Sequence, residues 1–305
     1  MHDVIIIGAG PAGYTAGIYC SRARHDTLLI SGILPGGQLM NTTDVENYPG
    51  FSDGIMGPDL MTVMRKQTEK MGTKIIDDEV TSVDFKNRPL KVKTASEEFE
   101  ARAVIVCTGA NPRKIGLEGE QTFAGKGVSY CATCDGAFFR DQELIVVGGG
   151  DSAMEEAIFL TKFASVVHIV HRKEEFRASK IMQERALSNE KIKVHFNSTV
   201  KEIHGDQKFQ QVVLNNTKTN EDKILEAGGL FIAIGHEPNS AIFQDQIELD
   251  GNGYIIIKNN TETNVTGVFC AGDVHDHRYR QAITAAGFGC MAAIDVDKYL
   301  SESNT

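Results

Sequence analysis

The sequence contains no apolar run approaching the roughly 18 residues that a membrane-spanning helix requires. Its start lacks a basic segment followed by a long apolar stretch, so we expect no signal peptide and cytoplasmic residence. Basic residues are fewer than acidic ones, with 31 Lys and Arg against 41 Asp and Glu, so the formal net charge is −10. Since phosphate binding needs a basic surface, this deficit argues against a nucleic-acid partner.

Cysteine is too sparse for the disulfide framework of a small secreted protein, with six in 305 residues. Only Cys131 and Cys134 lie close together, and the other four stand alone. A chain of this length buries enough surface to fold without a metal or disulfides. Its length predicts about two domains.

Short β-branched runs alternate with helical patterns along the chain. The runs typical of buried strands are residues 4–7, 104–106, 144–147, 166–170, 230–234 and 268–270, and the helical stretches are 11–24, 151–163 and 280–300. Short apolar strands that alternate with helices are typical of parallel sheets covered on both faces. The pattern therefore predicts an α/β fold.

The chain also repeats itself at long range. Residues 4–13 are echoed by residues 144–153, and residues 107–112 are echoed by residues 233–238. Because the two echoes come in the same order, they predict two similar, Rossmann-like dinucleotide-binding domains.

The C-terminal segment contains no third Gly-rich turn. Its strand at 268–270 assigns it to the first domain. We therefore expect a first domain made of residues 1–113 and 242–305, with a second domain of residues 114–241 inserted into it.

A Gly-rich turn joins the first predicted strand to the first helix. It carries the dinucleotide fingerprint, with residues Gly8, Gly10, Pro11, Ala12 and Gly13. The first glycine permits the tight turn, the second lets the backbone approach a pyrophosphate, and the third lets helix and strand pack closely. The N–H donors and positive dipole of the helix N-terminus favour the phosphates.

The acid that usually holds the adenosine ribose is missing after this fingerprint. The next strand ends in Ser31 and Gly32 instead of an Asp or Glu about 20 residues on. Gln38 is our candidate for holding the ribose.

The inner domain carries a second fingerprint, formed by Gly148, Gly150, Asp151, Ser152 and Ala153. The strand that follows it leads into His171, Arg172, Lys173 and Arg177. Because Arg binds phosphate bidentately, these cations favour a 2′-phosphate, and hence NADP over NAD. The alternative is a solvated charge run, which Glu174 and Glu175 keep open.

Cys131 and Cys134 form a Cys-x-x-Cys pair followed directly by Asp135. A structural zinc site needs four ligands, and the further candidates are only His275 and His277. A redox pair needs just two thiols, one to attack and one to resolve. In a chain with two dinucleotide fingerprints the redox interpretation is favoured, and Asp135 is placed to move protons to and from a thiolate.

The electron count links these motifs. NADPH delivers a hydride, which carries two electrons, and a disulfide accepts two. Hydride does not pass readily to sulfur, so a flavin is the natural intermediary. We expect FAD at the first fingerprint and NADPH at the second.

Together these residues resemble the low-molecular-weight thioredoxin reductases along essentially the whole chain. The resemblance is carried by both fingerprints and by residues 36–39, 45–50, 127–136, 171–177, 271–274 and 279–282. A Cys pair inside the second domain is specific, because other disulfide reductases of the wider flavoprotein class carry theirs near the first fingerprint.

The resemblance implies a role for each motif. FAD would be held by the first fingerprint with Gln38, Asn47, Gly272, Asp273, Arg280, Gln281 and Ala282, and NADPH by the second fingerprint with its cations. Cys134 would face the flavin, Cys131 would attack the disulfide of thioredoxin, and Asp135 would be the acid/base. Family members are homodimers. One departure is Lys173, where the family often has Arg.

Four other functions share parts of this pattern. A reductase for a glutaredoxin-like protein would use every motif. The flavoprotein of an alkyl hydroperoxide system would add an N-terminal disulfide domain, and ferredoxin–NADP reductases lack the Cys pair. A flavin-bound redox sensor would carry the same fingerprints without fast turnover, and steady NADPH oxidation with thioredoxin distinguishes it.

Overall fold

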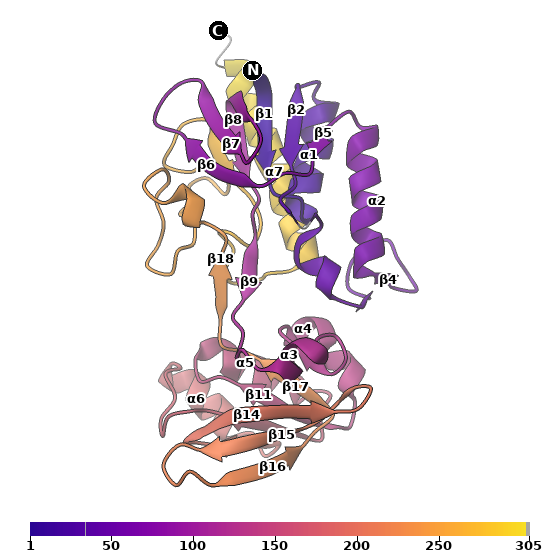
Figure 1. Cartoon of the computed structure of the whole chain (residues 1–305), viewed down its shortest axis with the longest axis vertical. Helices are drawn as coiled ribbons and strands as arrows, with labels where there is room; N and C mark the ends of the chain where they lie inside the picture. The colour runs from indigo at the N-terminus through magenta and orange to yellow at the C-terminus, as the bar shows by residue number, and fades with distance from the viewer. Residues whose placement is uncertain (34, 303–305) are drawn as a thin grey trace. The chain divides into compact units, whose positions relative to one another are not determined.

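The computed structural model describes residues 1–33 and 35–302, which fall into two compact units (Figure 1). One unit is Met1–Asn111 with the chain from Glu237 onward, and the other is Pro112–His236. The chain crosses between them twice, at β9 (Ala110–Pro112) and β18 (His236–Pro238), which pair as a two-stranded sheet. The predicted boundaries, after residues 113 and 241, lie slightly C-terminal to these crossings.

A mostly parallel sheet forms the centre of the first unit. Its order is β5 (Lys74–Ile76), β2 (Thr27–Ile30), β1 (His2–Ile7), β8 (Glu98–Val106), β7 (Leu90–Thr94) and β6 (Val80–Asp84), with β19 (Val268–Cys270) also paired to β8. β1 runs parallel to β2 and β8, whereas β7 is antiparallel to both β6 and β8. Because β19 pairs in parallel with β8, the C-terminal segment completes the first sheet.

Helices α1 (Pro11–Arg22) and α7 (Ala282–Glu302) pack closely against each other in this unit (Figure 1). A Cβ on Gly289 would lie 2.1 Å from the carbonyl oxygen of Ala12, so this approach requires glycine. α2 (Gly57–Lys70) also packs on α1. The shorter elements are the 3₁₀ helices η1 (Gly37–Asn41) and η3 (Ala241–Phe243) and the strands β3 (Asp44–Val45) and β4 (Ile55–Met56).

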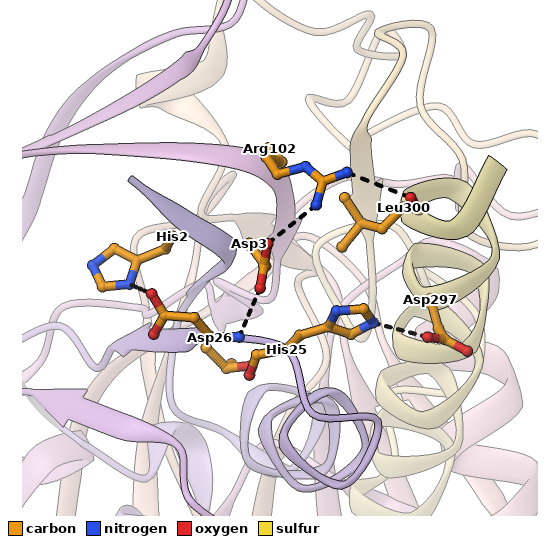
Figure 2. A network of polar contacts seen from close by, with 8 residues as sticks. His2, Asp3, His25, Asp26, Arg102, Asp297 and Leu300 are labelled. Atoms are coloured by element: carbon orange, nitrogen blue, oxygen red, sulfur yellow. Dashed lines mark hydrogen bonds and ion pairs between the residues drawn. The ribbon is translucent and has the colours of Figure 1, made fainter. Parts of the chain in front are cut away.

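A polar network ties the last turns of α7 to the start of the sheet (Figure 2). The Arg102 guanidinium donates to the Asp3 carboxylate at 3.2 Å and to the Leu300 carbonyl at 3.4 Å. The backbone N–H of Asp26 donates to Asp3 at 3.0 Å and holds the pKa of Asp3 below its usual value, against the effect of burial. Two further pairs complete the network, His2 with Asp26 at 2.9 Å and His25 with Asp297 at 2.8 Å.

A five-stranded parallel sheet forms the centre of the second unit. Its order is β10 (Val128–Ser129), β17 (Gly229–Ile232), β11 (Glu143–Val147), β12 (Val166–Val170) and β13 (Ile192–His195). The helical elements are α3 (Glu118–Thr122), α4 (Ala132–Asp135), η2 (Gly136–Phe139), α5 (Asp151–Leu160) and α6 (Lys180–Leu187).

The two faces of this sheet are covered differently, because alternate residues of a strand point to opposite faces. Leu144 and Val146 of β11 share a core with α5, whereas Ile145 shares a core with an antiparallel meander. The meander consists of β14 (Ser198–Gly205), β15 (Phe209–Asn216) and β16 (Asp222–Glu226).

The predicted α/β class is confirmed, and every predicted strand overlaps a parallel strand of one of the two sheets. α1 ends at Arg22 rather than residue 24, and α5 at Leu160 rather than residue 163. The meander is not predicted from the sequence, because its strands lack a recognisable apolar run. In β16, for example, only Leu225 is buried. Among the described residues, no helix has both the length and the apolar character needed to cross a membrane.

Candidate active site and cofactor-binding loops

Cys131 and Cys134 are joined by a disulfide, with their Cα atoms 5.3 Å apart. Cys131 is the N-cap of α4, and the backbone N–H of Cys134 donates to its Sγ at 3.2 Å. The single helical turn therefore brings the two sulfurs together and points a backbone donor at one of them. Both sulfurs are bonded to each other, so they are not zinc ligands in this structure.

Asp135 follows the pair, and its carboxyl is largely buried. Burial raises the pKa of Asp135, and a hydrogen bond from Ser129 Oγ to Asp135 Oδ2 acts against that rise. The backbone N–H of Cys131 donates to the same Ser129 oxygen at 3.0 Å. One hydroxyl thus connects the acid/base candidate to the Cys pair. Sequence reasoning assigns Ser129 no role, and its only signal is its position two residues before Cys131.

The first Gly-rich turn needs two of its glycines for backbone contacts. Gly8 has a φ of 108°, and a Cβ there would lie 2.3 Å from the carbonyl oxygen of Cys107. A Cβ on Gly13 would lie 1.9 Å from the carbonyl oxygen of Gly8. Gly10 differs, because no atom of the described chain outside its own neighbourhood comes within 4 Å of such a Cβ. Open space at the second glycine fits a pyrophosphate that approaches the backbone.

The second Gly-rich turn repeats this geometry. A Cβ on Gly148 would lie 2.4 Å from the carbonyl oxygen of Ala233, as Gly8 meets Cys107 in the first turn. At Gly150 the space is again open within the part of the chain that is described. Cys107 and Ala233 are the first residues of the repeated motifs at 107–112 and 233–238. In each unit, the first residue of this motif therefore contacts the first glycine of the Gly-rich turn.

The cations that follow β12 are exposed and available. Within residues 1–33 and 35–302, the side chains of Arg172, Lys173 and Arg177 make no hydrogen bond or ion pair. Glu174 pairs with Lys218 instead, which holds the pKa of Glu174 below its usual value. Glu175 is exposed and makes no ion pair among the described residues, so neither acid neutralises the cations, and they remain free for an anion.

His171 packs beside the second turn rather than in solvent. A Cβ on Gly149 would lie 2.2 Å from the His171 ring, so the ring lies directly on the turn. His171 Nε2 contacts the Glu175 carbonyl at 3.0 Å. Burial and the nearby Arg177 and Arg172 lower the pKa of His171, which favours the neutral form of the ring.

Asp273 has the features of a cofactor-binding residue. Its Oδ1 is buried and finds no hydrogen-bond partner among the described residues. Burial and neighbouring Asp276 raise the pKa of Asp273 to about 7, against the effect of Arg280. A buried polar oxygen without a partner is costly, so a donor from a bound group belongs there. The hydroxyl groups of FAD supply such donors, so this residue fits the expected cofactor.

The tail motif packs against the first fingerprint. Gly272 has a φ of 82°, and a Cβ there would lie 3.0 Å from the Ala12 side chain. Asn47 Nδ2 donates to Gln281 Oε1 at 3.4 Å, although 234 residues separate them. The structure therefore brings together Asn47, the tail motif and the first turn, as the sequence predicts for an FAD site.

Gln38 lies in a chain of side-chain amides. Its Nε2 donates to Asn111 Oδ1 at 2.6 Å, and Asn111 Nδ2 donates to Asn239 Oδ1 at 2.9 Å. Its role towards a ribose stays a prediction. An acid does lie at the end of β2, because Ser31 Oγ donates to Asp77 Oδ1 at 2.8 Å. Sequence reasoning misses Asp77 because it follows β5, 46 residues later.

The predicted site residues divide between the two units. The Cys pair, Asp135, the second fingerprint and the cations lie in Pro112–His236. The first fingerprint, Gln38, Asn47 and the residues from Gly272 to Ala282 lie in the other unit. Among the described residues, no cluster of three or more His, Cys, Asp or Glu side chains is suited to a metal ion.

Known proteins of one family match this chain throughout. The pyridine nucleotide-disulphide oxidoreductase family matches residues 2–289. A thioredoxin reductase from Streptomyces clavuligerus is 54% identical over 307 residues, covering 99% of this chain and 94% of that protein. The chain belongs to the thioredoxin reductase family. A solved thioredoxin reductase from Giardia duodenalis has a TM-score of 0.95 at 42% identity, covering 98% of this chain and 99% of that one.

A further relative is named for two activities in one protein. A bifunctional thioredoxin reductase/thioredoxin from Mycobacterium leprae is 51% identical over 304 residues, covering 99% of this chain and 66% of that protein. Membership of the family confirms the predicted pair of Rossmann-like domains and the enzyme class. The chain is a flavoprotein disulfide oxidoreductase with FAD and NADPH as its cofactors.

Proposed function

We propose that this chain reduces the disulfide of thioredoxin with electrons from NADPH. The observation that carries the proposal is the Cys131–Cys134 disulfide, with the Ser129–Asp135 hydrogen bond beside it. The relative that joins a thioredoxin reductase and a thioredoxin in one protein supports thioredoxin as the partner.

When bound, FAD supplies the two-electron chemistry between NADPH and the disulfide. Two electrons break the Cys131–Cys134 bond and leave two reduced sulfurs. Cys131 then attacks the partner's disulfide, forms a mixed disulfide and releases one partner thiolate. Cys134 attacks Cys131 in turn, which restores the intramolecular disulfide and releases the second thiolate. Asp135, whose pKa is raised by burial, exchanges protons with these sulfurs as acid and base.

We assign the cofactors to separate domains. The FAD-binding domain is the unit of Met1–Asn111 and the chain from Glu237, and the NADPH-binding domain is Pro112–His236. The residues proposed for FAD are Gly8, Gly10, Pro11, Ala12, Gly13, Gln38, Asn47, Gly272, Asp273, Arg280, Gln281 and Ala282. Those proposed for NADPH are Gly148, Gly150, Asp151, Ser152, Ala153, His171, Arg172, Lys173 and Arg177.

We also propose that two copies associate through α1 and α7. Large apolar side chains are exposed on these helices: Tyr19 by 43%, Ile283 by 43%, Met291 by 38% and Ile294 by 55%. Because α1 and α7 pack against each other, several exposed apolar side chains on this pair of helices favour an interface there. Sedimentation over a range of concentrations tests the association of two copies, and a monomer throughout would contradict it.

Cytoplasmic residence is also part of the proposal, because that compartment keeps thiols reduced.

The proposed reaction is tested with Cys131→Ser and Cys134→Ser in the FAD-loaded protein. Each variant should lose thioredoxin reduction, because attack and resolution need both sulfurs, while NADPH still bleaches the flavin absorbance. Cys290→Ser is the control, since Cys290 is a free cysteine outside the pair and should leave turnover unchanged. If either pair variant reduced thioredoxin at a near-normal rate, the assignment of the redox centre would be wrong.

A further inference from the structure

The segment between β12 and α6 contains the three free cations but no regular helix or strand. Such a segment samples many conformations unless contacts hold it, and each ordered residue has an entropic cost. Arg172 and Arg177 can read a phosphate only if their backbone stays at one distance from the turn that holds the pyrophosphate. The contacts that hold the segment therefore decide how well it reads the coenzyme.

Two backbone bonds attach the segment to the second Gly-rich turn. The carbonyl oxygen of Gly149 accepts the N–H of Arg177 at 2.7 Å and the N–H of Ala178 at 3.1 Å. Phe176 is buried, with its ring 5.4 Å from that of His171 and 4.8 Å from that of Phe196. Because these contacts are made by backbone atoms and aromatic rings, substitution of a nearby polar side chain leaves them in place.

Two side chains hold the end of the segment. Gln183 Nε2 donates to the Ala178 carbonyl at 2.8 Å, and Asp151 forms a clasp with Ser179. Asp151 Oδ1 accepts both the backbone N–H and the hydroxyl of Ser179, each at 2.8 Å, across 28 residues of sequence. Asp151 is the first residue of α5, directly after Gly150. The clasp therefore joins the end of the cation segment to the helix N-terminus that is assigned to the pyrophosphate.

Ser179 is used here in an unusual way. It is the N-cap of α6, a position where a serine oxygen normally accepts an N–H from the first helical turn. Its side chain makes no capping bond and donates to Asp151 instead. Asp151 likewise turns its carboxylate towards Ser179. The acid thus gains two donors beside a site where a free carboxylate would repel a phosphate.

We infer that Asp151 and Ser179 form a positioning clasp for coenzyme selection, which sets the distance between the cation segment and the pyrophosphate-binding turn. This inference rests on the proposed NADPH site and deepens it. NADP and NAD share the pyrophosphate and differ in the 2′-phosphate that only the cations contact. Opening the clasp therefore weakens NADP binding and leaves NAD binding unchanged. Ser179 acts only through the placement of Arg172 and Arg177 and is a positioning residue, whereas Asp151 is also one of the residues proposed to hold NADPH.

The test measures binding of NADP⁺ and NAD⁺ to the oxidised, FAD-loaded protein by calorimetry. Ser179→Ala should raise the Kd for NADP⁺ about fivefold, the size of one ordinary hydrogen bond, with no change for NAD⁺. Ser179→Thr keeps the hydroxyl and should restore the NADP⁺ affinity. Ser188→Ala is the matched control, because its hydroxyl bonds the Arg185 carbonyl at the other end of α6. It should change neither affinity.

A double-mutant cycle with Asp151→Ala separates the clasp from general effects. Removing the Asp151 charge can alter binding of both coenzymes, so the ratio of the NADP⁺ and NAD⁺ affinities is the readout. Ser179→Ala removes the hydroxyl bond but keeps the bond from its backbone N–H, whereas Asp151→Ala removes both bonds. The double variant should therefore show the same ratio as Asp151→Ala, because no bond of the clasp is left for the second substitution to remove. Additive changes in the ratio, or an unchanged ratio in Ser179→Ala, would overturn the clasp.

Arg172→Ala in the same assay distinguishes a failure of the clasp from a failure of the proposed NADPH site. If Arg172→Ala removes the preference for NADP⁺ but Ser179→Ala does not, the clasp is wrong and the NADPH site stands. If the unmodified protein shows no preference for NADP⁺, the assignment of the cations to the 2′-phosphate fails first.

Discussion

The hydroxyl of Ser129 donates a 2.5 Å hydrogen bond to Asp135 Oδ2, at the end of the strand that leads into the Cys pair. Ser129 also accepts the N–H of Cys131, so its oxygen is oriented from both sides. A hydrogen bond to the charged form of an acid lowers its pKa, whereas burial raises it. The pKa of Asp135 is therefore set by a balance between its burial and a single hydroxyl.

Ser129→Ala should raise the pKa of Asp135 further, because the donor that stabilises the carboxylate is lost. We expect the limb of the pH profile for thioredoxin reduction that depends on Asp135 to move up by about one pH unit, the size of one hydrogen bond to a charged group. Asp135→Asn identifies that limb by removing it. Ser198→Ala, which removes another hydroxyl in the same unit, is the control. An unmoved limb in Ser129→Ala would contradict the coupling.

Replacing Arg172 and Arg177 with Ala should raise the KM for NADPH much more than the KM for NADH. Each lost charge-assisted hydrogen bond is worth roughly 1.5–3 kcal/mol, which corresponds to about ten- to a hundredfold in KM. Lys193→Ala removes an exposed cation of the same unit and should have little effect on either KM. Steady-state kinetics with both coenzymes provide the measurement, and equal activity of the unmodified enzyme with both would argue against the assignment.

Gly10→Ala and Gly150→Ala should separate the two nucleotide sites. Both positions have open space for a Cβ and extended backbone that alanine adopts, so the FAD-free protein should keep its Tm. The added methyl occupies the approach of a pyrophosphate, and we expect a loss of roughly tenfold or more in the affinity for one ligand only. Gly10→Ala should weaken FAD binding, and Gly150→Ala should weaken NADP⁺ binding. Equal effects on both ligands in either variant would refute the division.

Asp273 should make the stability of the FAD-free protein depend on pH. Its pKa is raised to about 7 in the folded protein, whereas an unfolded Asp titrates near 4. Between these values the folded state holds a proton that the unfolded state has lost, so the free energy of unfolding falls as pH rises. The slope from this group approaches 1.4 kcal/mol per pH unit at about pH 5 to 6.

Asp273→Asn removes this titration and should flatten the profile in the same window. Urea unfolding of the FAD-free protein and its variant across this range measures the difference between the two slopes. Identical slopes would show that the Asp273 carboxyl is not held protonated by burial.

The features that could be predicted without the structure are those that depend on a few neighbouring residues. Strand, Gly-rich turn and helix start follow one another within about ten residues, so Gly8 to Gly13 and Gly148 to Ala153 could be identified from spacing. The Cys131–Cys134 pair is equally local, because one helical turn brings the two sulfurs together.

The contacts between distant side chains could not be predicted in this way, because they depend on how each unit packs. Asp151 bonds Ser179 across 28 residues, Ser31 bonds Asp77 across 46, and Asn47 reaches Gln281 across 234. The same holds for the raised pKa of Asp273, because its burial depends on segments far away in the chain. Local propensity carries no information on these contacts, since they form when separate strands and helices pack into one core. The residue types could be read from the sequence, but packing alone selected their partners and their burial.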